Sequence, residues 1–166
     1  MRRAFILFGS NIAPFENLSR ALTELKASFD VVAVSPPFLT APVGDTEQED
    51  FINVAIEIRT DWEPATIHQR LREAERRLGR RRDPARRLGP RSVDLDLVLI
   101  EGVAGSFGEL KLPSPLLEGE AFVAVPLAAL APEVVPPGLK SNLATIAERT
   151  IAHCARPPRL ATEVTP

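Results

Sequence analysis

The sequence predicts an α+β domain built around an antiparallel sheet. Residues 3–8 form a short apolar run, residues 51–60 alternate between apolar and polar side chains, and residues 93–100 form a third strand-like segment. Two amphipathic segments separate these strands, one on each side of residues 51–60. Strands and helices that alternate in this way predict one sheet covered by helices.

The first strand and helix follow from local signals. The apolar run over residues 3–8 ends at Gly9-Ser10-Asn11, which is typical of a turn. A helix is predicted over about residues 14–28, because Pro14 is tolerated in a first helical turn. Its apolar side chains recur at helical spacing, at Leu18, Ala21, Leu22 and Leu25.

Two strands and a helix are predicted next. Residues 31–35 are rich in strand-forming residues and stop at Pro36-Pro37, and residues 40–45 are predicted to be a loop. Residues 51–60 place apolar side chains at every second position, which indicates one buried face. After a turn at residues 60–64, a second helix ends at Gly79, a plausible C-cap. Its apolar stripe is Ile67, Leu71, Ala74 and Leu78.

The remaining chain adds the last strand of the core pattern and shorter elements. We predict a strand at residues 93–100, a short edge strand at 110–115 and helices at 122–130 and 143–149. The order β-α-β-β-α-β is typical of a ferredoxin-like sandwich, an antiparallel sheet with helices on one face and active-site loops on the other. We expect a single domain over residues 1–156 and a disordered tail over 157–166.

Composition excludes several classes of protein. The chain of 166 residues is long enough for one domain with a core, and its net charge of −2 gives no global reason to expect nucleic acid. The single Cys154 excludes an intramolecular disulfide and a cysteine-rich zinc site. The apolar run after Arg2 and Arg3 is too short for a signal peptide, and no stretch approaches the ~20 apolar residues of a membrane span. These features favour a cytoplasmic protein without a membrane partner.

The charge is concentrated in one segment. Eight arginines lie between Arg76 and Arg91, against one acidic residue, Asp83. Guanidinium groups pair with phosphate oxygens bidentately, so the cluster suggests a small anionic ligand. A solvated face and an RNA-binding module are the alternatives. The chain has no Tyr and only one Trp, so it is poorly equipped to stack bases, and a flexible loop that closes over a polyphosphate fits better.

Asp94 and Asp96 follow the arginine segment directly. In a strand, residues two apart face the same side, with Cα atoms roughly 7 Å apart. The two carboxylates could therefore share one or two Mg²⁺ ions, which bridge phosphate oxygens. The alternative is an ordinary solvated strand face, although Asp is a poor strand former.

Weaker signals come from two other places. Gly9-Ser10-Asn11 could place backbone amides near a phosphate, but the chain has no Walker A sequence. Phe51, Asn53 and Phe122 could form a slot for a flat ring whose polar edge Asn53 reads, and otherwise both phenylalanines belong to the core.

Together these residues resemble the 6-hydroxymethyl-7,8-dihydropterin pyrophosphokinases of folate biosynthesis. The most specific stretch is Gly-Pro-Arg-Ser-Val-Asp-Leu-Asp at residues 89–96. Residues 40–44, Gln48, residues 51–53 and the pattern Glu75-x-x-x-Gly79-Arg80-x-Arg82 also match. The resemblance extends from residue 9 to residue 132.

The resemblance implies transfer of pyrophosphate from ATP to a pterin, whose hydroxymethyl oxygen attacks the β-phosphorus while AMP leaves. Catalysis would depend on Arg80 and Arg91, which grip phosphates, and on Asp94 and Asp96, which hold two Mg²⁺ ions. It also implies two binding sets. The nucleotide side would comprise Glu75, Arg82, Arg87, Leu110, Lys111 and Ser114, and the pterin side Thr40, Pro42, Val43, Phe51, Asn53 and Phe122. The partners would be these two small molecules, and the protein would be a monomer or weak dimer.

Three positions depart from the family pattern. Ser114 stands where a nucleotide-contacting His is usual, Glu120 where a phosphate-side Arg is usual, and Leu88 where a Trp is common. A carboxylate beside a triphosphate is expected to weaken ATP binding by roughly tenfold to a hundredfold. Two hypotheses follow: an active pyrophosphokinase with an altered ATP site, or a pterin-binding protein with weak or no ATP-dependent activity.

Overall fold

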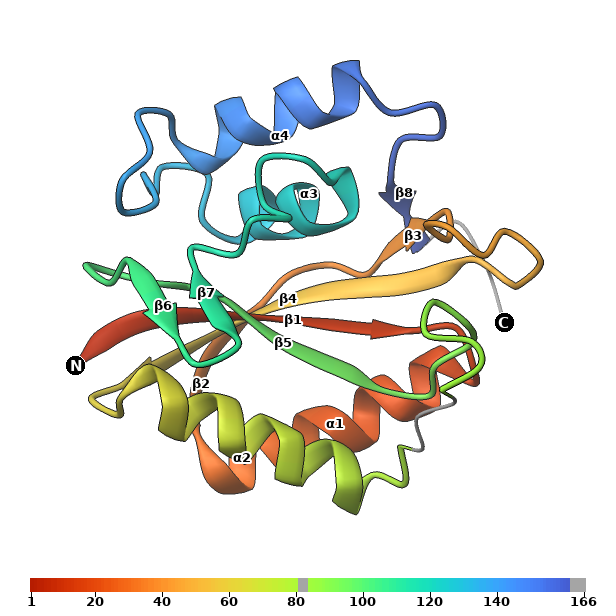
Figure 1. The fold of residues 1–166 in the computed structure, drawn as a ribbon, viewed down its shortest axis with the longest axis horizontal. Coiled ribbons are helices and arrows are strands. Elements are labelled where there is room, and N and C mark those ends of the chain that lie inside the picture. The colour runs from red at the N-terminus through yellow and green to blue at the C-terminus, as the bar shows by residue number, and fades with distance from the viewer. Residues whose placement is uncertain (81–83, 162–166) are drawn as a thin grey trace.

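The computed structural model describes residues 1–80 and 84–161, and its main sheet is antiparallel (Figure 1). The strand order is β5 (Asp94–Ile100), β1 (Arg2–Ser10), β4 (Phe51–Thr60), β3 (Phe38–Thr40) and β8 (Arg159–Leu160). A further strand, β2 (Asp30–Val34), pairs with β4. The ferredoxin-like α+β class predicted from the element order is confirmed.

The register of the three central strands aligns the polar residues of the site. Gly9 lies opposite Asn53 on β4 and opposite Asp94 on β5. Two residues before Gly9 on β1, the same face carries Leu7, which lies opposite Asp96. Side chains that lie opposite each other in a sheet share a face, so Asn53, Asp94 and Asp96 all point to the same side.

The first face of the sheet is covered by the two predicted amphipathic helices, α1 (Pro14–Ser28) and α2 (Pro64–Arg77) (Figure 1). Each begins with a proline in its first turn, where the missing N–H costs no hydrogen bond. After α2 the chain turns at Gly79, whose φ of 84° is readily adopted only by glycine. The core beneath them includes Ile6, Phe8, Leu25, Ile56, Ile67, Leu71 and Leu95.

The second face also carries helices, α3 (Ala121–Leu130) and α4 (Leu143–Ala152) (Figure 1). They pack over Phe5, Leu7 and Val98 in a second core cluster. The prediction assigned only loops to this face; in the structure the loops share it with α3 and α4. The reason is that α3 is apolar on all sides and is stable only between the sheet and another helix.

The segments after β5 differ in two details from the sequence prediction. β7 (Leu110–Leu112) lies in a two-stranded hairpin with β6 (Gly105–Phe107), outside the main sheet. The sequence predicts a disordered tail from residue 157. This prediction is wrong for the first residues of the tail, because β8 pairs with β3. Ala161 is 2% exposed in the first core, and its amide donates to the Pro37 carbonyl. Residues 162–166 lie outside the described residues.

No helix among the described residues combines the length and the hydropathy needed to cross a bilayer.

Candidate active site

The candidate site lies on the second face of the sheet, at the end of β1, β4 and β5 and beside α3. Two cavities adjoin there, and both are lined by Arg91, Asp94 and Asp96. The smaller holds about 100 Å³ and is mostly apolar, with Leu7, Gly9, Thr40, Ala41, Val43, Phe51, Asn53, Leu88 and Phe122 in its wall. The larger holds about 560 Å³ and adds Arg72, Arg80, Pro84, Arg86, Arg87, Gly89 and Pro90.

The smaller cavity has the composition of a slot for a flat ring. Phe51 on β4 and Phe122 on α3 both line it, although they are 71 residues apart in the sequence. The side-chain amide of Asn53, which is 4% exposed, donates to the Thr40 hydroxyl at 2.6 Å. This bond holds the Asn53 amide in one orientation at the wall of the slot.

Gly9 matters because it makes room for Asn53. A Cβ added at Gly9 would lie 2.9 Å from Asn53 Oδ1, closer than carbon and oxygen atoms tolerate. The sequence showed this glycine only as part of a turn. Its position between two strands that both carry polar side chains is visible only in the sheet register.

The predicted pterin-side residues are divided between two neighbouring cavities. Thr40 and Val43 line the slot, whereas Pro42 lines a third cavity of about 250 Å³ next to it. Thr40, Val43 and Phe122 border both. Glu120 and Arg156 also line this third cavity.

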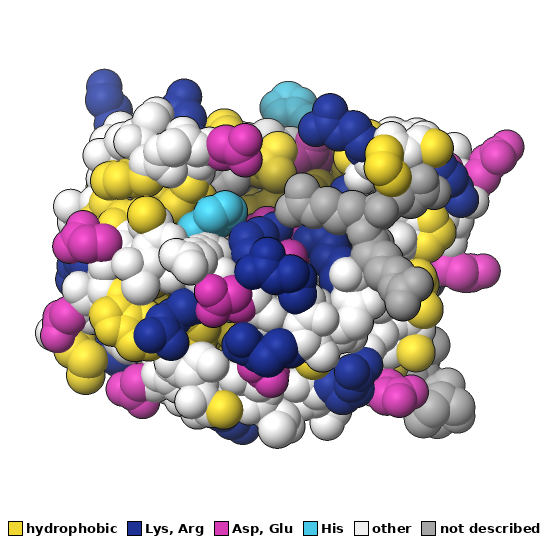
Figure 2. Space-filling model, turned by 60° about the horizontal axis from the view of Figure 1, so that its bottom comes forward, with side chains coloured by type: hydrophobic (Ala, Val, Ile, Leu, Met, Phe, Trp, Pro, Cys, Tyr) yellow, Lys and Arg dark blue, Asp and Glu magenta, His cyan; other side chains and the backbone are white. Residues whose placement is uncertain are grey.

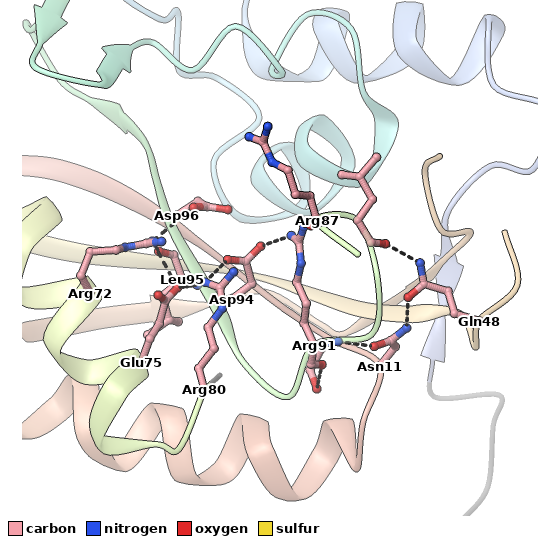
Figure 3. A network of polar contacts seen from close by, with 12 residues as sticks. Asn11, Gln48, Arg72, Glu75, Arg80, Arg87, Arg91, Asp94, Leu95 and Asp96 are labelled. Carbon is pink, nitrogen blue, oxygen red and sulfur yellow. Dashed lines mark hydrogen bonds and ion pairs between the residues drawn. The ribbon is translucent and has the colours of Figure 1, made fainter. Parts of the chain in front are cut away.

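Asp94 is held by two arginines (Figure 3). Arg80 Nη1 lies 2.9 Å from Asp94 Oδ1, and Arg91 Nη1 lies 2.8 Å from Asp94 Oδ2. The Asp94 side chain is 15% exposed, and both arginines line the larger cavity. The structure therefore joins three of the four residues of the predicted phosphate and metal core, and the fourth, Asp96, lines the same cavity.

Glu75 is the buried anchor of this network. Its side chain extends from α2 to the edge of β5, where Oε1 accepts a hydrogen bond from the Leu95 amide at 2.8 Å. Arg80 donates to the same oxygen at 2.8 Å, and Arg72 Nη2 lies 3.2 Å from it. Burial raises the pKa of Glu75, and Arg72, the Leu95 amide and Arg80 oppose that rise. Protein groups thus converge on one oxygen of this carboxylate, and through it Glu75 positions the arginines around the cavity.

Asp96 is the more open of the two aspartates. Its side chain is 52% exposed, and its ion-pair partner is Arg72 at 3.3 Å. Partial removal from water and the charge of Asp94 raise the pKa of Asp96 to about 7, while Arg72 opposes the rise. The half-exposed position limits what removal from water contributes.

Arg91 is positioned by a residue that sequence reasoning assigned elsewhere. The Asn11 side-chain oxygen accepts from the Arg91 amide at 2.8 Å, and the Asn11 amide donates to the Arg91 carbonyl at 3.0 Å (Figure 3). The sequence suggests that the backbone amide of Asn11 could lie near a phosphate; in the structure it donates to the Arg91 carbonyl instead. The Asn11 side chain also donates to Gln48 at 2.8 Å.

The loops on the two sides of the slot are joined to each other. Gln48 donates to the Leu88 carbonyl at 2.6 Å, and Arg86 Nε donates to Asp45 at 2.9 Å. Leu88 packs against Gly44, where a Cβ would collide with its side chain. Gln48, which the sequence marks only through its match to the family pattern, thus connects residues 40–50 to the arginine segment.

The other predicted nucleotide-side residues lie in different surroundings. Arg87 lines the larger cavity, and its carbonyl accepts from Arg91 at 2.6 Å. Leu110 is buried in the first core, Lys111 is exposed on β7, and the Ser114 amide donates to the Val98 carbonyl at 2.7 Å. None of these three residues lines the three cavities above. Arg82 lies outside the described residues.

The wall of the larger cavity is cationic overall, because it contains five arginines and two aspartates. Figure 2 shows lysine and arginine side chains gathered at the centre of one face, with acidic side chains between them. Within the described part of the chain, no group of three or more His, Cys, Asp or Glu side chains is arranged to hold a metal by itself. Asp94 and Asp96 supply two carboxylates, which suits an ion such as Mg²⁺ that takes its remaining ligands from water and substrate phosphates.

Comparison with known proteins identifies the family. The family model described as 7,8-dihydro-6-hydroxymethylpterin-pyrophosphokinase matches residues 5–132. The chain is 40% identical to the 2-amino-4-hydroxy-6-hydroxymethyldihydropteridine pyrophosphokinase of Methylorubrum extorquens, over 81% of this chain and 86% of that one. It is 36% identical to the protein of that name from Bacillus subtilis, over 79% of each chain.

A solved structure has a similar fold. The HPPK-DHPS chain of Plasmodium falciparum, crystallised with pteroate, superposes with a TM-score of 0.72 at 8% identity. The match covers 92% of this chain but 43% of that longer one, so it shows likeness of fold alone. The extent of the family match, the identity to its members and the aspartate-arginine geometry agree, and the chain belongs to the 7,8-dihydro-6-hydroxymethylpterin-pyrophosphokinase family.

Proposed function

We propose that this protein transfers pyrophosphate from ATP to the hydroxymethyl group of 6-hydroxymethyl-7,8-dihydropterin, which gives AMP and the pterin diphosphate in folate biosynthesis. The observation that carries this proposal is the junction of an aromatic slot and an arginine-lined cavity at Asp94 and Asp96. A flat acceptor in the slot and a polyphosphate in the cavity would meet at these carboxylates. Such a reaction requires mainly positioning and charge stabilisation.

The slot suits the pterin. Phe51 and Phe122 supply apolar contact for a ring, and aromatic side chains favour stacked or edge-on contact with a flat heterocycle. Asn53, oriented by Thr40, can both donate to and accept from the polar edge of a pterin. The pterin would then present its hydroxymethyl group toward Arg91 and the aspartates.

The larger cavity suits the phosphate chain. Arg80 and Arg91 already face Asp94, so their guanidinium groups are in place for phosphate oxygens. Two Mg²⁺ ions held by Asp94 and Asp96 would neutralise phosphate charge and hold the transferred group in line. Arg87, in the wall of the same cavity, would add to the cationic surroundings.

The proposed reaction forms a bond from the pterin hydroxymethyl oxygen to the β-phosphorus of ATP. The bond between the β-phosphorus and the oxygen bridging it to the α-phosphate breaks, AMP leaves with that oxygen, and the hydroxyl proton is lost to solvent or a nearby base. Arg80 and Arg91 would stabilise the charge that develops on the transferred group.

A second candidate is a pterin-binding protein with weak or no ATP-dependent activity. It is motivated by Ser114 and Glu120, which replace the usual His and Arg. Glu120 lines the third cavity and is not among the residues that line the arginine-lined one. This placement favours the active enzyme.

One assay separates the two candidates. Purified protein is incubated with a high concentration of MgATP and 6-hydroxymethyl-7,8-dihydropterin, and AMP and pterin diphosphate are separated by chromatography. AMP formed in step with pterin diphosphate supports the transferase. Pterin binding without either product supports the second candidate, and in that case Glu120→Arg with Ser114→His should raise ATP affinity or restore activity.

A further inference from the structure

Arg72 is a cationic residue of the site that the sequence patterns did not single out. It lies on α2, one turn before Glu75, and lines the larger cavity together with Arg80, Arg87 and Arg91. Its Nη2 donates to the Leu95 carbonyl and lies 3.3 Å from Asp96 Oδ1 (Figure 3). The side chain is 19% exposed, so it is enclosed by the protein but reaches the cavity wall.

The charge balance of the network depends on Arg72. Among the described residues, this network of ion pairs contains three guanidinium groups and three carboxylates. The guanidinium groups belong to Arg72, Arg80 and Arg91, and the carboxylates belong to Glu75, Asp94 and Asp96. Without Arg72 two guanidinium groups would face three carboxylates, and the linked cluster would attract a triphosphate less strongly.

Arg72 also keeps donor capacity that the protein does not use. Its Nε is buried and finds no hydrogen-bond acceptor among the described residues. Arginine has five N–H donors in a planar fork, and a buried donor without an acceptor is unfavourable. Because Nε is buried, a ligand oxygen in the cavity would meet the Nη end of the fork, which lies beside Asp96.

We propose that Arg72 binds the phosphate chain of the nucleotide in the larger cavity. The inference rests on the proposed function, because it assigns a residue to the nucleotide cavity of that reaction. Asp96 and the Leu95 carbonyl hold the guanidinium beside the cavity before the nucleotide arrives. Arg72 is a binding residue in this account, and its loss acts first on nucleotide affinity.

The test measures binding without turnover. Calorimetric titration with α,β-methylene-ATP and with AMP, both with Mg²⁺, is compared for the unaltered protein, Arg72→Gln and Arg77→Gln. Arg77 is the matched control because it loses the same charge from the same helix but pairs with Glu24 on α1, outside the cavity. Pterin binding, followed by fluorescence, reports whether each variant keeps its fold.

Arg72→Gln is expected to weaken binding of the triphosphate analogue at least about tenfold and binding of AMP less, with pterin affinity retained. Arg77→Gln should match the unaltered protein. Arg72→Lys keeps the charge and should retain most of the affinity for the analogue, which also provides a test if the glutamine variant folds poorly.

Three outcomes would overturn the inference. The first is that Arg72→Gln binds the analogue as tightly as the unaltered protein does. The second is that Arg72→Gln loses affinity for the analogue, AMP and pterin to the same extent. The third is that Arg72→Lys binds the analogue as weakly as Arg72→Gln does. In each of these the proposed function still stands if the unaltered protein binds the analogue. If the unaltered protein does not bind the analogue, both the inference about Arg72 and the proposed function are contradicted.

Discussion

Asp94 and Asp96 face the same cavity but have different numbers of protein partners. Asp94 is 15% exposed between Arg80 and Arg91, whereas Asp96 is 52% exposed beside Arg72. The side chain with fewer partners has more free ligand positions for a cation. At the scale of single residues, Asp96 is therefore the residue whose loss should affect the chemistry most and the fold least.

Asp96→Asn is expected to lower kcat at least about a hundredfold, because an amide is a poor Mg²⁺ ligand and carries no charge. The free energy of unfolding should change by less than about 1 kcal/mol, as for other half-exposed positions. Activity assays and urea unfolding check both expectations. Asp61→Asn, at a position whose side chain is 74% exposed on the surface, is the control. A fully active Asp96→Asn would refute the metal role.

Gly9→Ala tests whether the orientation of Asn53 in the slot matters for pterin binding. The new methyl group would lie 2.9 Å from Asn53 Oδ1 and displace the amide from its bond to Thr40. Pterin affinity should fall by roughly tenfold, because the slot loses its oriented polar group. Fluorescence titration measures this fall. Gly119→Ala, where an added Cβ meets nothing within 4 Å, should bind pterin normally; unchanged binding by Gly9→Ala would argue against Asn53 as the polar contact.

At the scale of elements, α2 and the edge of β5 form one unit. Glu75 accepts from the Leu95 amide and Arg72 donates to the Leu95 carbonyl, so side chains of α2 satisfy both backbone groups at the sheet edge. The Ser114 amide satisfies the Val98 carbonyl further along β5. These contacts protect an edge strand from pairing with another chain, and they fix the strand that carries both aspartates.

Glu75→Ala should destabilise the protein by about 3–5 kcal/mol, because it leaves two arginines and a backbone amide without their shared acceptor. Chemical denaturation measures the loss. Glu75→Gln keeps an acceptor for Leu95 and should cost less. Equal stability of the alanine variant and the unaltered protein would show that Glu75 does not anchor the unit.

Asn11→Ala tests the connection between β1 and the arginine segment. The variant loses the acceptor for the Arg91 amide and the donor to Gln48, which should raise the KM for ATP and lower stability by about 1–3 kcal/mol. Asn142→Ala, which removes the N-cap of α4, should cost similar stability without changing the KM. If both variants show the same KM as the unaltered protein, Asn11 has no role in placing Arg91.

At the scale of the whole molecule, residues far apart in the chain enclose the pterin slot. β3 carries Thr40 and is paired on its other side by β8, and Arg156 forms an ion pair of 2.7 Å with Asp50. The C-terminal segment is therefore part of the structure that holds residues 40–50 in place, although its composition predicts a disordered tail.

Deletion of residues 157–166 should lower both the free energy of unfolding and pterin affinity. The deletion removes the pairing of β8 with β3 and the buried Ala161. Urea unfolding and pterin titration measure the two effects. A shortened protein with unchanged stability and affinity would mean that the segment contributes nothing to the slot.

The sequence alone determined the features that depend on local pattern. Strand alternation placed Asp94 and Asp96 on one face, helical spacing located α1 and α2, and the order of the elements indicated the ferredoxin-like class. Pro14 and Gly79 marked helix ends correctly because their backbone preferences act within a few residues, whereas Pro64, predicted as part of a turn, is the first residue of α2.

The tertiary structure alone decided which distant residues meet. Arg72 reaches Asp96 only because α2 packs along the edge of β5, and Asn11 meets Arg91 only because β1 lies beside that strand. The helices on the second face and the pairing of β8 likewise arise from burial of surfaces that other segments present. Periodicity records which face a residue occupies, but the partner on that face is set by packing between segments that are distant in sequence.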